Sequence, residues 1–108
     1  MKPNRQETQS QHEAAENALF RAVVSIRNPA ECRSFLRDLC TPAELQALVD
    51  RWQVVELLEQ GLTYRRINEL TGVSVTTIGR VARFLADGFG GYRTAVDRTV
   101  GRDNPTSH

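Results

Sequence analysis

The side chains best suited to chemistry gather in one stretch of the chain, TYRRINELTGVSVTTIGRV, at residues 63–81. Arg65 and Arg66 carry guanidinium groups, whose planar forks of N–H donors match the oxygens of phosphates and carboxylates. The hydroxyls of Thr76 and Thr77 can both donate and accept hydrogen bonds. Side chains of these kinds bind anions and polar edges. They do not by themselves form a set that breaks covalent bonds.

Basic charge is concentrated in the same part of the chain, although the whole protein carries a formal net charge of only +1. Residues 12–60 hold eight acidic side chains and five arginines, a balance of −3, whereas residues 61–85 hold four arginines and one glutamate, a balance of +3. A local basic patch favours a polyanionic partner. The alternative is an ordinary solvated helical face.

Two short helices joined by a glycine turn are predicted for this stretch. Thr63 is suited to cap a helix that runs to about Thr71, Gly72 makes the turn, and Ser74 caps the second helix. The expected inward-facing residues are Ile67, Leu70 and Val73, then Val75 or Ile78, then Val81, Phe84 and Leu85. This spacing is typical of a helix-turn-helix. Asn68 departs from the pattern, because a small residue usually stands four positions before the glycine.

Double-stranded DNA is the partner that this composition favours. The first turn of the second helix would meet base edges in the major groove, where Gly79 permits close approach. Arginines at the start of the preceding helix would contact phosphates. The expected DNA-contacting residues are Tyr64, Arg65, Arg66, Asn68, Ser74, Val75, Thr76, Thr77, Gly79, Arg80 and Arg83. A helix-turn-helix used as a protein-interaction adaptor is the alternative, but the second helix lacks the aromatic or long aliphatic anchors of interaction hot spots.

Three more helices are expected before this pair. An amphipathic helix starts at about Gln11, a second starts at Asn28-Pro29, and a third starts at the capping box Thr41-Pro42-Ala43-Glu44 and ends at Gly61. Their expected apolar stripes are Ala15, Leu19, Ala22, Val23 and Ile26; Cys32, Phe35, Leu36 and Leu39; and Leu45, Leu48, Trp52, Val55 and Leu58 or Glu59. Together they give one helical domain over residues 11–100, between disordered tails at residues 1–10 and 101–108.

The first of these helices has an excess of apolar surface. Phe20 and Val24 lie outside its main stripe, so the helix is apolar on more than one side. A chain of 108 residues offers little surface to cover both sides. This excess favours association with a second copy.

Composition excludes several classes of function. With 40% hydrophobic and 25% charged residues and no run of 18 apolar ones, a soluble cytoplasmic protein without a membrane span is expected. Cys32 and Cys40 are expected to be buried thiols, and His12 and His108 stand too far apart to share a metal. No nucleophile motif or phosphate-binding glycine loop occurs. We therefore expect no catalysis, no cofactor and no metal.

The segments NPAECRSFLRDLCTPAEL, GLTYRRINELTGVSVTTIGRV and GGYRTAVDR resemble the YerC/YecD branch of the Trp repressor superfamily. The resemblance runs from Leu19 to about Arg98, roughly three quarters of the chain. It implies an all-α fold of about six helices in which two chains interlace as a homodimer. It also implies a sequence-specific DNA-binding transcriptional regulator with a two-fold-related operator, and favours repression over activation.

The resemblance further implies a ligand site. In Trp repressor two arginines enclose the indole of tryptophan and a threonine lies beside its carboxylate; the matching positions here are Arg51, Arg80 and Thr41. Two positions depart from the family, because Val81 replaces a glycine near the indole and Phe84 replaces a serine near the amino group. Such a pocket is partly filled by its own side chains, so L-tryptophan is not expected to bind. A tryptophan-dependent repressor remains the alternative.

Overall fold

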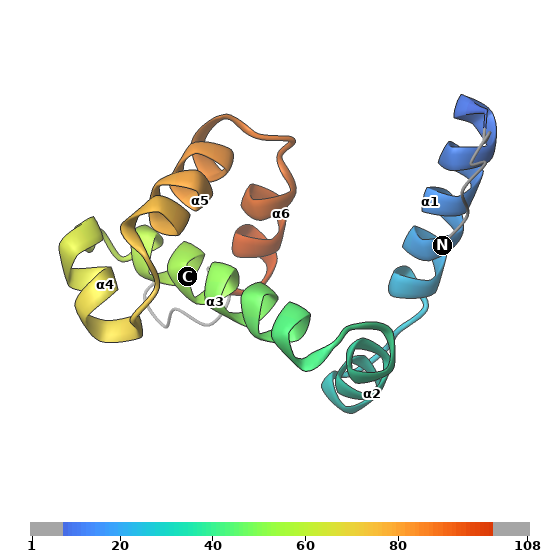
Figure 1. Cartoon of the computed structure of the whole chain (residues 1–108), viewed down its shortest axis with the longest axis horizontal. Coiled ribbons are helices and arrows are strands. Elements are labelled where there is room, and N and C mark those ends of the chain that lie inside the picture. Colours follow the sequence, from blue (N-terminus) through green and yellow to red (C-terminus); the bar gives the residue numbers. More distant parts are fainter. Residues whose placement is uncertain (1–7, 101–108) are drawn as a thin grey trace. The chain divides into compact units, whose positions relative to one another are not determined.

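The computed structural model describes residues 8–100, and over this range it contains six α-helices and no strand. The helices are α1 (Gln9–Val24), α2 (Pro29–Leu39), α3 (Pro42–Glu59), α4 (Tyr64–Thr71), α5 (Val75–Asp87) and α6 (Gly91–Arg98), as labelled in Figure 1. The predicted all-α fold is confirmed. The contacts divide the chain into two compact units, Met1–Thr41 and Pro42–His108. The single domain predicted over residues 11–100 stays a prediction.

Side-chain caps start the two helices of the first unit. The hydroxyl of Thr8 accepts a hydrogen bond from the backbone N–H of Gln11 at 3.2 Å. The helix α1 therefore begins at Gln9, and the expected disorder is wrong for residues 8–10; residues 1–7 and 101–108 lie outside the described residues. As predicted, Asn28 caps α2, accepting from the N–H of Glu31 at 2.9 Å.

No residue between positions 8 and 41 is buried. Leu39, expected on the buried stripe of α2, is 52% exposed, and Val24 of α1 is 81% exposed. Cys32 and Cys40 are half-buried, so the expectation of buried thiols is wrong for the single chain. The physical reason is that α1 and α2 form few enclosing contacts, and a side chain is removed from water only when neighbours surround it.

The core of the protein lies in the second unit. It is formed by Val54 and Val55 of α3, Ile67 of α4, Val73 of the turn, Ile78 and Val81 of α5, and Val96 of α6. The helix α5 contacts α3, α4 and α6 (Figure 1). Trp52, Leu57, Leu58, Leu62, Leu85, Tyr92 and Val100 pack around this core.

The core settles several sequence predictions. Ile67 is fully buried, as expected, but Leu70 is 51% exposed, so its predicted inward position is wrong. Of the two alternatives at the start of α5, Ile78 is buried and Val75 is 55% exposed. In α3 Leu48 is 43% exposed. The predicted stripe is confirmed for Val55, which is buried, and for Trp52 and Leu58, which pack around the core. The buried Val54 lies outside that stripe, because packing against α4 and α5 covers a wider face of α3 than predicted.

The turn between α4 and α5 is held by side chains of α4. Gly72 has a positive φ of 76°, which is the left-handed conformation predicted for it. The side-chain amide of Asn68 donates to the carbonyl of Val73 at 2.9 Å. The hydroxyl of Thr71 accepts from the N–H of Val73 at 3.0 Å and donates to the carbonyl of Ile67 at 2.7 Å. Both backbone polar groups of the buried Val73 are therefore satisfied without water.

Polar and aromatic contacts attach α6 to α3. Arg93 donates a hydrogen bond to Glu59, and its guanidinium also lies 3.7 Å from Asp97. The hydrogen bond and the negative charge of Glu59 raise the pKa of Arg93 above its usual value, so this side chain stays charged. The rings of Trp52 and Tyr92 lie 6.4 Å apart between centroids. These contacts place Tyr92 beside α5.

The substitution Asn68→Ala tests the side-chain lock of the turn. It leaves the carbonyl of the buried Val73 without its donor, and an unsatisfied buried acceptor costs about 1–3 kcal/mol. We expect thermal or urea unfolding to show a loss of stability in that range. The control Leu70→Ala removes an exposed side chain of the same helix and should change stability by about 0.5 kcal/mol or less. Equal losses in the two variants would contradict the lock.

Candidate nucleic-acid interface

The burial of one side of α5 determines which side faces outward. Ile78 and Val81 point into the core, with exposed fractions of 0% and 2%. Because an α-helix advances 100° per residue, Thr76 and Arg83 lie on the opposite side, and both are exposed. The first turn of α5 therefore presents exposed side chains, such as that of Thr76, on the side away from the core.

Two of the expected base-contacting hydroxyls take part in the cap of α5. The hydroxyl of Ser74 accepts from the backbone N–H of Thr77 at 3.1 Å, and the hydroxyl oxygens of the two residues lie 3.0 Å apart. Thr77 is half-buried. By contrast, Val75 and Thr76 are exposed. Val75 and Thr76 therefore remain accessible in the first turn and take no part in the cap.

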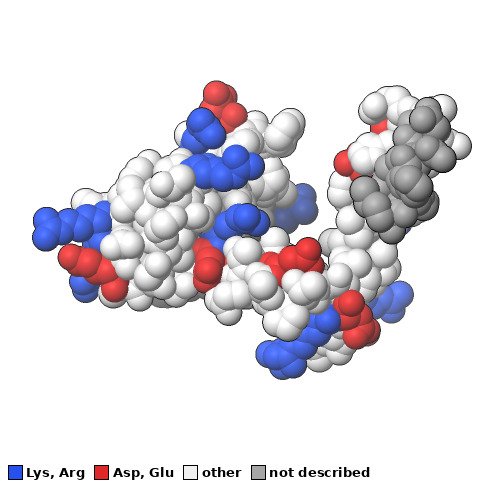
Figure 2. All heavy atoms as spheres, viewed as in Figure 1, with Lys and Arg blue, Asp and Glu red and all other residues white. Residues whose placement is uncertain are grey.

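The arginines of α4 share one carboxylate. Arg65 Nε lies 3.5 Å from one oxygen of Glu69, and Arg66 Nη1 lies 3.3 Å from the other. Basic and acidic side chains are seen side by side over α4 in Figure 2. Both arginines are largely exposed, and exposed pairs of this kind are weak. Their guanidinium groups can therefore exchange Glu69 for a phosphate at small cost.

Tyr64 and Gly79 connect the two helices on the exposed side. A Cβ atom built on Gly79 would lie 3.9 Å from the ring of Tyr64, which is ordinary contact distance. Packing within the chain therefore does not require glycine here. Tyr64 itself is 43% exposed at the start of α4. The expected role of Gly79, to let a partner approach, stays a prediction.

Asn68 has a structural role that the sequence did not indicate. It was expected to contact DNA, but its amide nitrogen is bound to the carbonyl of Val73 and the residue is half-buried. The only sequence signal was its departure from the small residue usual at this position. Its structural role is to hold the turn, and a direct contact to DNA through the amide nitrogen would require that bond to break.

Arg80 and Phe84 form a stacked pair on α5. The guanidinium carbon of Arg80 lies 4.8 Å from the centre of the Phe84 ring, and that of Arg83 lies 5.8 Å from it. A cation over an aromatic face is attracted by the ring's quadrupole. Arg80 remains exposed while it stacks on the ring, so this contact orients its side chain without removing it from the surface, and its expected contact with DNA stays a prediction.

Four residues of the expected ligand pocket meet at one small hollow. Its volume is about 250 Å³, and it is lined by Arg51, Arg80, Val81, Phe84 and Tyr92. Tyr92 was not expected there, because the sequence does not indicate where α6 packs. Thr41, the remaining expected member, ends the first unit and immediately precedes α3. The hollow is therefore lined by side chains of α3, α5 and α6. The ring of Phe84 is one of them, at a position where the Trp repressor pocket has a serine.

Residues 8–100 offer neither a metal site nor a membrane-spanning helix. In this range no group of three or more histidine, cysteine, aspartate or glutamate side chains is arranged to hold a metal ion. Within the same range, no helix combines the length and apolar character needed to cross a membrane.

Comparison with known proteins agrees with this geometry. Residues 14–100 match the family model described as Trp repressor protein. The protein YerC of Bacillus subtilis (strain 168), whose function is uncharacterized, is 39% identical over 89 residues, which cover 82% of this chain and 86% of that protein.

Two solved structures share the fold. A crystal structure from Staphylococcus aureus, provisionally designated a Trp repressor, has a TM-score of 0.77 and 38% sequence identity, covering 87% of this chain and 96% of that one. A TrpR-like protein from Eubacterium eligens ATCC 27750 has a TM-score of 0.71 and 36% identity, covering 88% and 93%. The family match spans most of the chain and includes both helices of the candidate interface. The chain therefore belongs to the Trp repressor family, in the branch that contains YerC.

Proposed function

We propose that the protein is a sequence-specific DNA-binding transcriptional regulator that uses α4 and α5 as a helix-turn-helix. The observation that carries the proposal is the orientation of α5: Ile78 and Val81 are buried, so Val75 and Thr76 are presented outward. An exposed first turn of this kind fits the major groove of B-DNA. Arg65 and Arg66 at the start of the neighbouring helix supply the positive charge for phosphates.

Repression is the favoured direction of regulation, because the family is described by its repressor. The direct test is selection of bound sequences from random duplex DNA with the full chain. We expect an enriched palindrome whose half-sites are about one helical turn apart. Enrichment of no sequence would contradict the proposal.

A second function has some support from exposed apolar side chains. Phe89, between α5 and α6, is fully exposed, and Leu70 of α4 is 51% exposed. Such groups can serve as anchors for another protein, so an adaptor is the alternative function. Binding to DNA depends steeply on salt, because phosphate contacts release counterions, whereas apolar docking does not. Salt dependence of the bound complex distinguishes the two functions.

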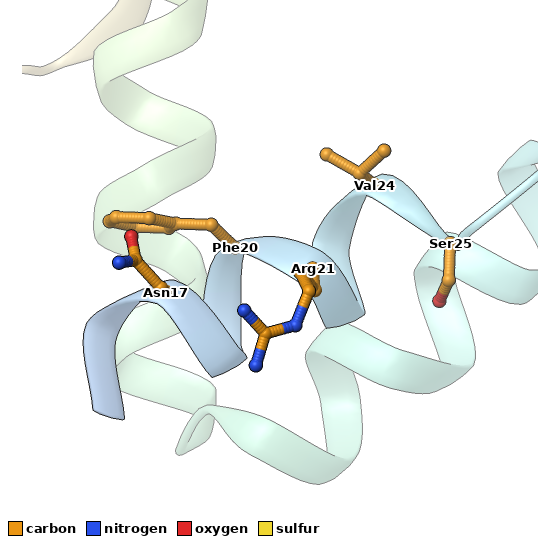
Figure 3. Close-up of a pocket in the computed structure, with 5 residues that line it drawn as sticks. All are labelled: Asn17, Phe20, Arg21, Val24 and Ser25. Carbon is orange, nitrogen blue, oxygen red and sulfur yellow. The ribbon is translucent and has the colours of Figure 1, made fainter. Parts of the chain in front are cut away.

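The homodimer is part of the same proposal. Four large apolar side chains of α1 are exposed to solvent. Their exposed fractions are 40% for Leu19, 53% for Phe20, 48% for Val23 and 81% for Val24. Phe20 and Val24 extend from α1 beside Asn17, Arg21 and Ser25, and these five residues line a shallow apolar hollow (Figure 3). A contiguous apolar surface of this kind is usually covered by a partner. We assign the partner as a second copy of this chain, which would also supply the second helix-turn-helix for a two-fold-related operator.

L-Tryptophan is not assigned as the effector. The Phe84 ring lies 4.8 Å from the guanidinium carbon of Arg80, and Val81 is 2% exposed. These two side chains, which replace a serine and a glycine of Trp repressor, therefore occupy space beside the arginine that would contact the indole. Overpacking a closed site costs about 1–3 kcal/mol, and an ammonium without its hydroxyl partner costs a similar amount. Each 1.4 kcal/mol weakens binding about tenfold. The expected loss is therefore roughly a hundredfold or more.

Two variants of α4 test the role of its charges. Arg65→Ala should weaken binding to all duplexes and reduce the slope of log affinity against log salt by about one unit. Glu69→Gln should have the opposite effect, because it releases both arginines from their shared carboxylate. Fluorescence anisotropy over a salt series measures both. Unchanged slopes in both variants would show that these arginines do not contact phosphates.

The substitution Leu19→Asp tests the dimer. In a dimer that covers α1 it would bury an unpaired carboxylate, which costs several kcal/mol, so the protein should unfold instead of forming a stable monomer. Ser10→Asp is the control, because it places the same charge on the opposite side of α1. Light scattering and circular dichroism report mass and folding. A folded native monomer would disprove the dimer.

The effector prediction is tested by calorimetric titration with L-tryptophan and by operator binding with and without it. We expect no micromolar binding and no change in DNA affinity. Phe84→Ser, alone and combined with Val81→Gly, should open the hollow and create measurable binding; the single variant leaves the core residue Val81 in place. Micromolar affinity of the native protein coupled to tighter DNA binding would reverse the assignment.

A further inference from the structure

Methyl groups dominate the exposed first turn of α5. Val75 is 55% exposed and presents two methyl groups, and the exposed Thr76 presents one. The neighbouring hydroxyls of Ser74 and Thr77 lie 3.0 Å apart and take part in the helix cap. The outward tip of the helix is therefore more apolar than its sequence of small polar residues indicates.

Long hydrogen-bonding side chains are absent from this first turn, whose residues are Val75, Thr76, Thr77 and Ile78. The first arginine of α5, Arg80, stacks on Phe84 and lines the hollow with Arg51. The side-chain amide of Asn68 is bound to the carbonyl of Val73. In Figure 2 the visible surface over the first part of α5 is uncharged, and basic side chains are seen over its later part. The first turn thus offers no arginine, lysine, asparagine or glutamine for bidentate contact with guanine or adenine.

Apolar surface continues across to α4. The ring of Tyr64 is 43% exposed and lies beside Gly79, where a Cβ would approach it to 3.9 Å. Because Gly79 carries no side chain, nothing projects from its position beside the Tyr64 ring. The exposed methyl groups of Val75 and Thr76 therefore can contact a small apolar group of a partner without breaking a hydrogen bond within the chain.

The major groove contains one such group, the C5-methyl of thymine. We propose that Val75 and Thr76 recognise thymine methyl groups, so that the first turn of α5 selects T·A pairs by apolar contact. This inference rests on the proposed function, because it requires α5 to enter the major groove. Burying one methyl group contributes about 0.8 kcal/mol, which corresponds to roughly a fourfold change in affinity.

The experiment replaces thymine by deoxyuridine, which pairs identically with adenine but lacks the methyl group. The probe is the highest-affinity duplex enriched from random DNA, with thymines substituted one position at a time in both half-sites. Binding of the full chain is measured by fluorescence anisotropy. At one or two positions in each half-site we expect a loss of roughly fourfold per methyl group. The other positions should bind equally with either base.

Side-chain variants assign the contact to its residues. Val75→Ala removes two methyl groups, and Thr76→Ser removes one while keeping the hydroxyl. Because both residues are exposed, these changes should leave the fold intact, which circular dichroism checks. The double variant should bind the thymine and deoxyuridine duplexes equally. The matched control Leu70→Ala, on the exposed surface of α4, should keep the native preference for thymine.

The outcomes separate this inference from the proposed function. Sequence-specific binding with no loss on any deoxyuridine substitution would overturn thymine recognition and leave the regulator standing. A preference for thymine that persists in the double variant would assign the methyl contact to other residues, and would also overturn the inference. Failure to enrich any duplex would overturn both proposals together. A preference that disappears in the double variant and persists in Leu70→Ala supports thymine recognition by this turn.

Discussion

The burial of Ile67, Val73 and Ile78 around one tight turn is the constraint on which the rest of the candidate interface depends. These side chains are 0%, 8% and 0% exposed. Because they are closely packed between α4 and α5, the angle between the two helices can change little. Asn68 and Thr71 complete the joint by satisfying the backbone of Val73. Because the joint is filled, the outward side of α5 is held as a rigid surface.

Intramolecular partners decide which polar groups remain accessible on that surface. Arg65 and Arg66 lie against Glu69 through weak exposed pairs, so a phosphate can replace the carboxylate. Arg80 is different, because it stacks on Phe84 beside the hollow lined by Arg51. These exposed arginines therefore differ only in their partners within the chain, because those of α4 pair with a carboxylate and Arg80 stacks on an aromatic ring.

The two units differ in how far they bury their apolar residues. Residues 42–100 contain the whole described core, whereas residues 8–41 contain no buried side chain. Leu19 and Phe20 remain accessible although they form part of a regular helix. The exposed side chains of α1 are the apolar excess that the spacing of these residues predicts.

The sequence alone determined the local features of this protein: the caps at Asn28, Thr63 and Ser74, the left-handed glycine at position 72, and the helix-turn-helix with its basic charge. These follow from interactions between residues a few positions apart. Tertiary structure decided which of Val75 and Ile78 faces inward, left Leu70 exposed and brought Tyr92 to the hollow. Helical spacing permits more than one apolar face, and only the space available between packed helices selects among them. For the same reason, the bond from Asn68 to Val73 could not be predicted from spacing, since it depends on how sharply the chain turns.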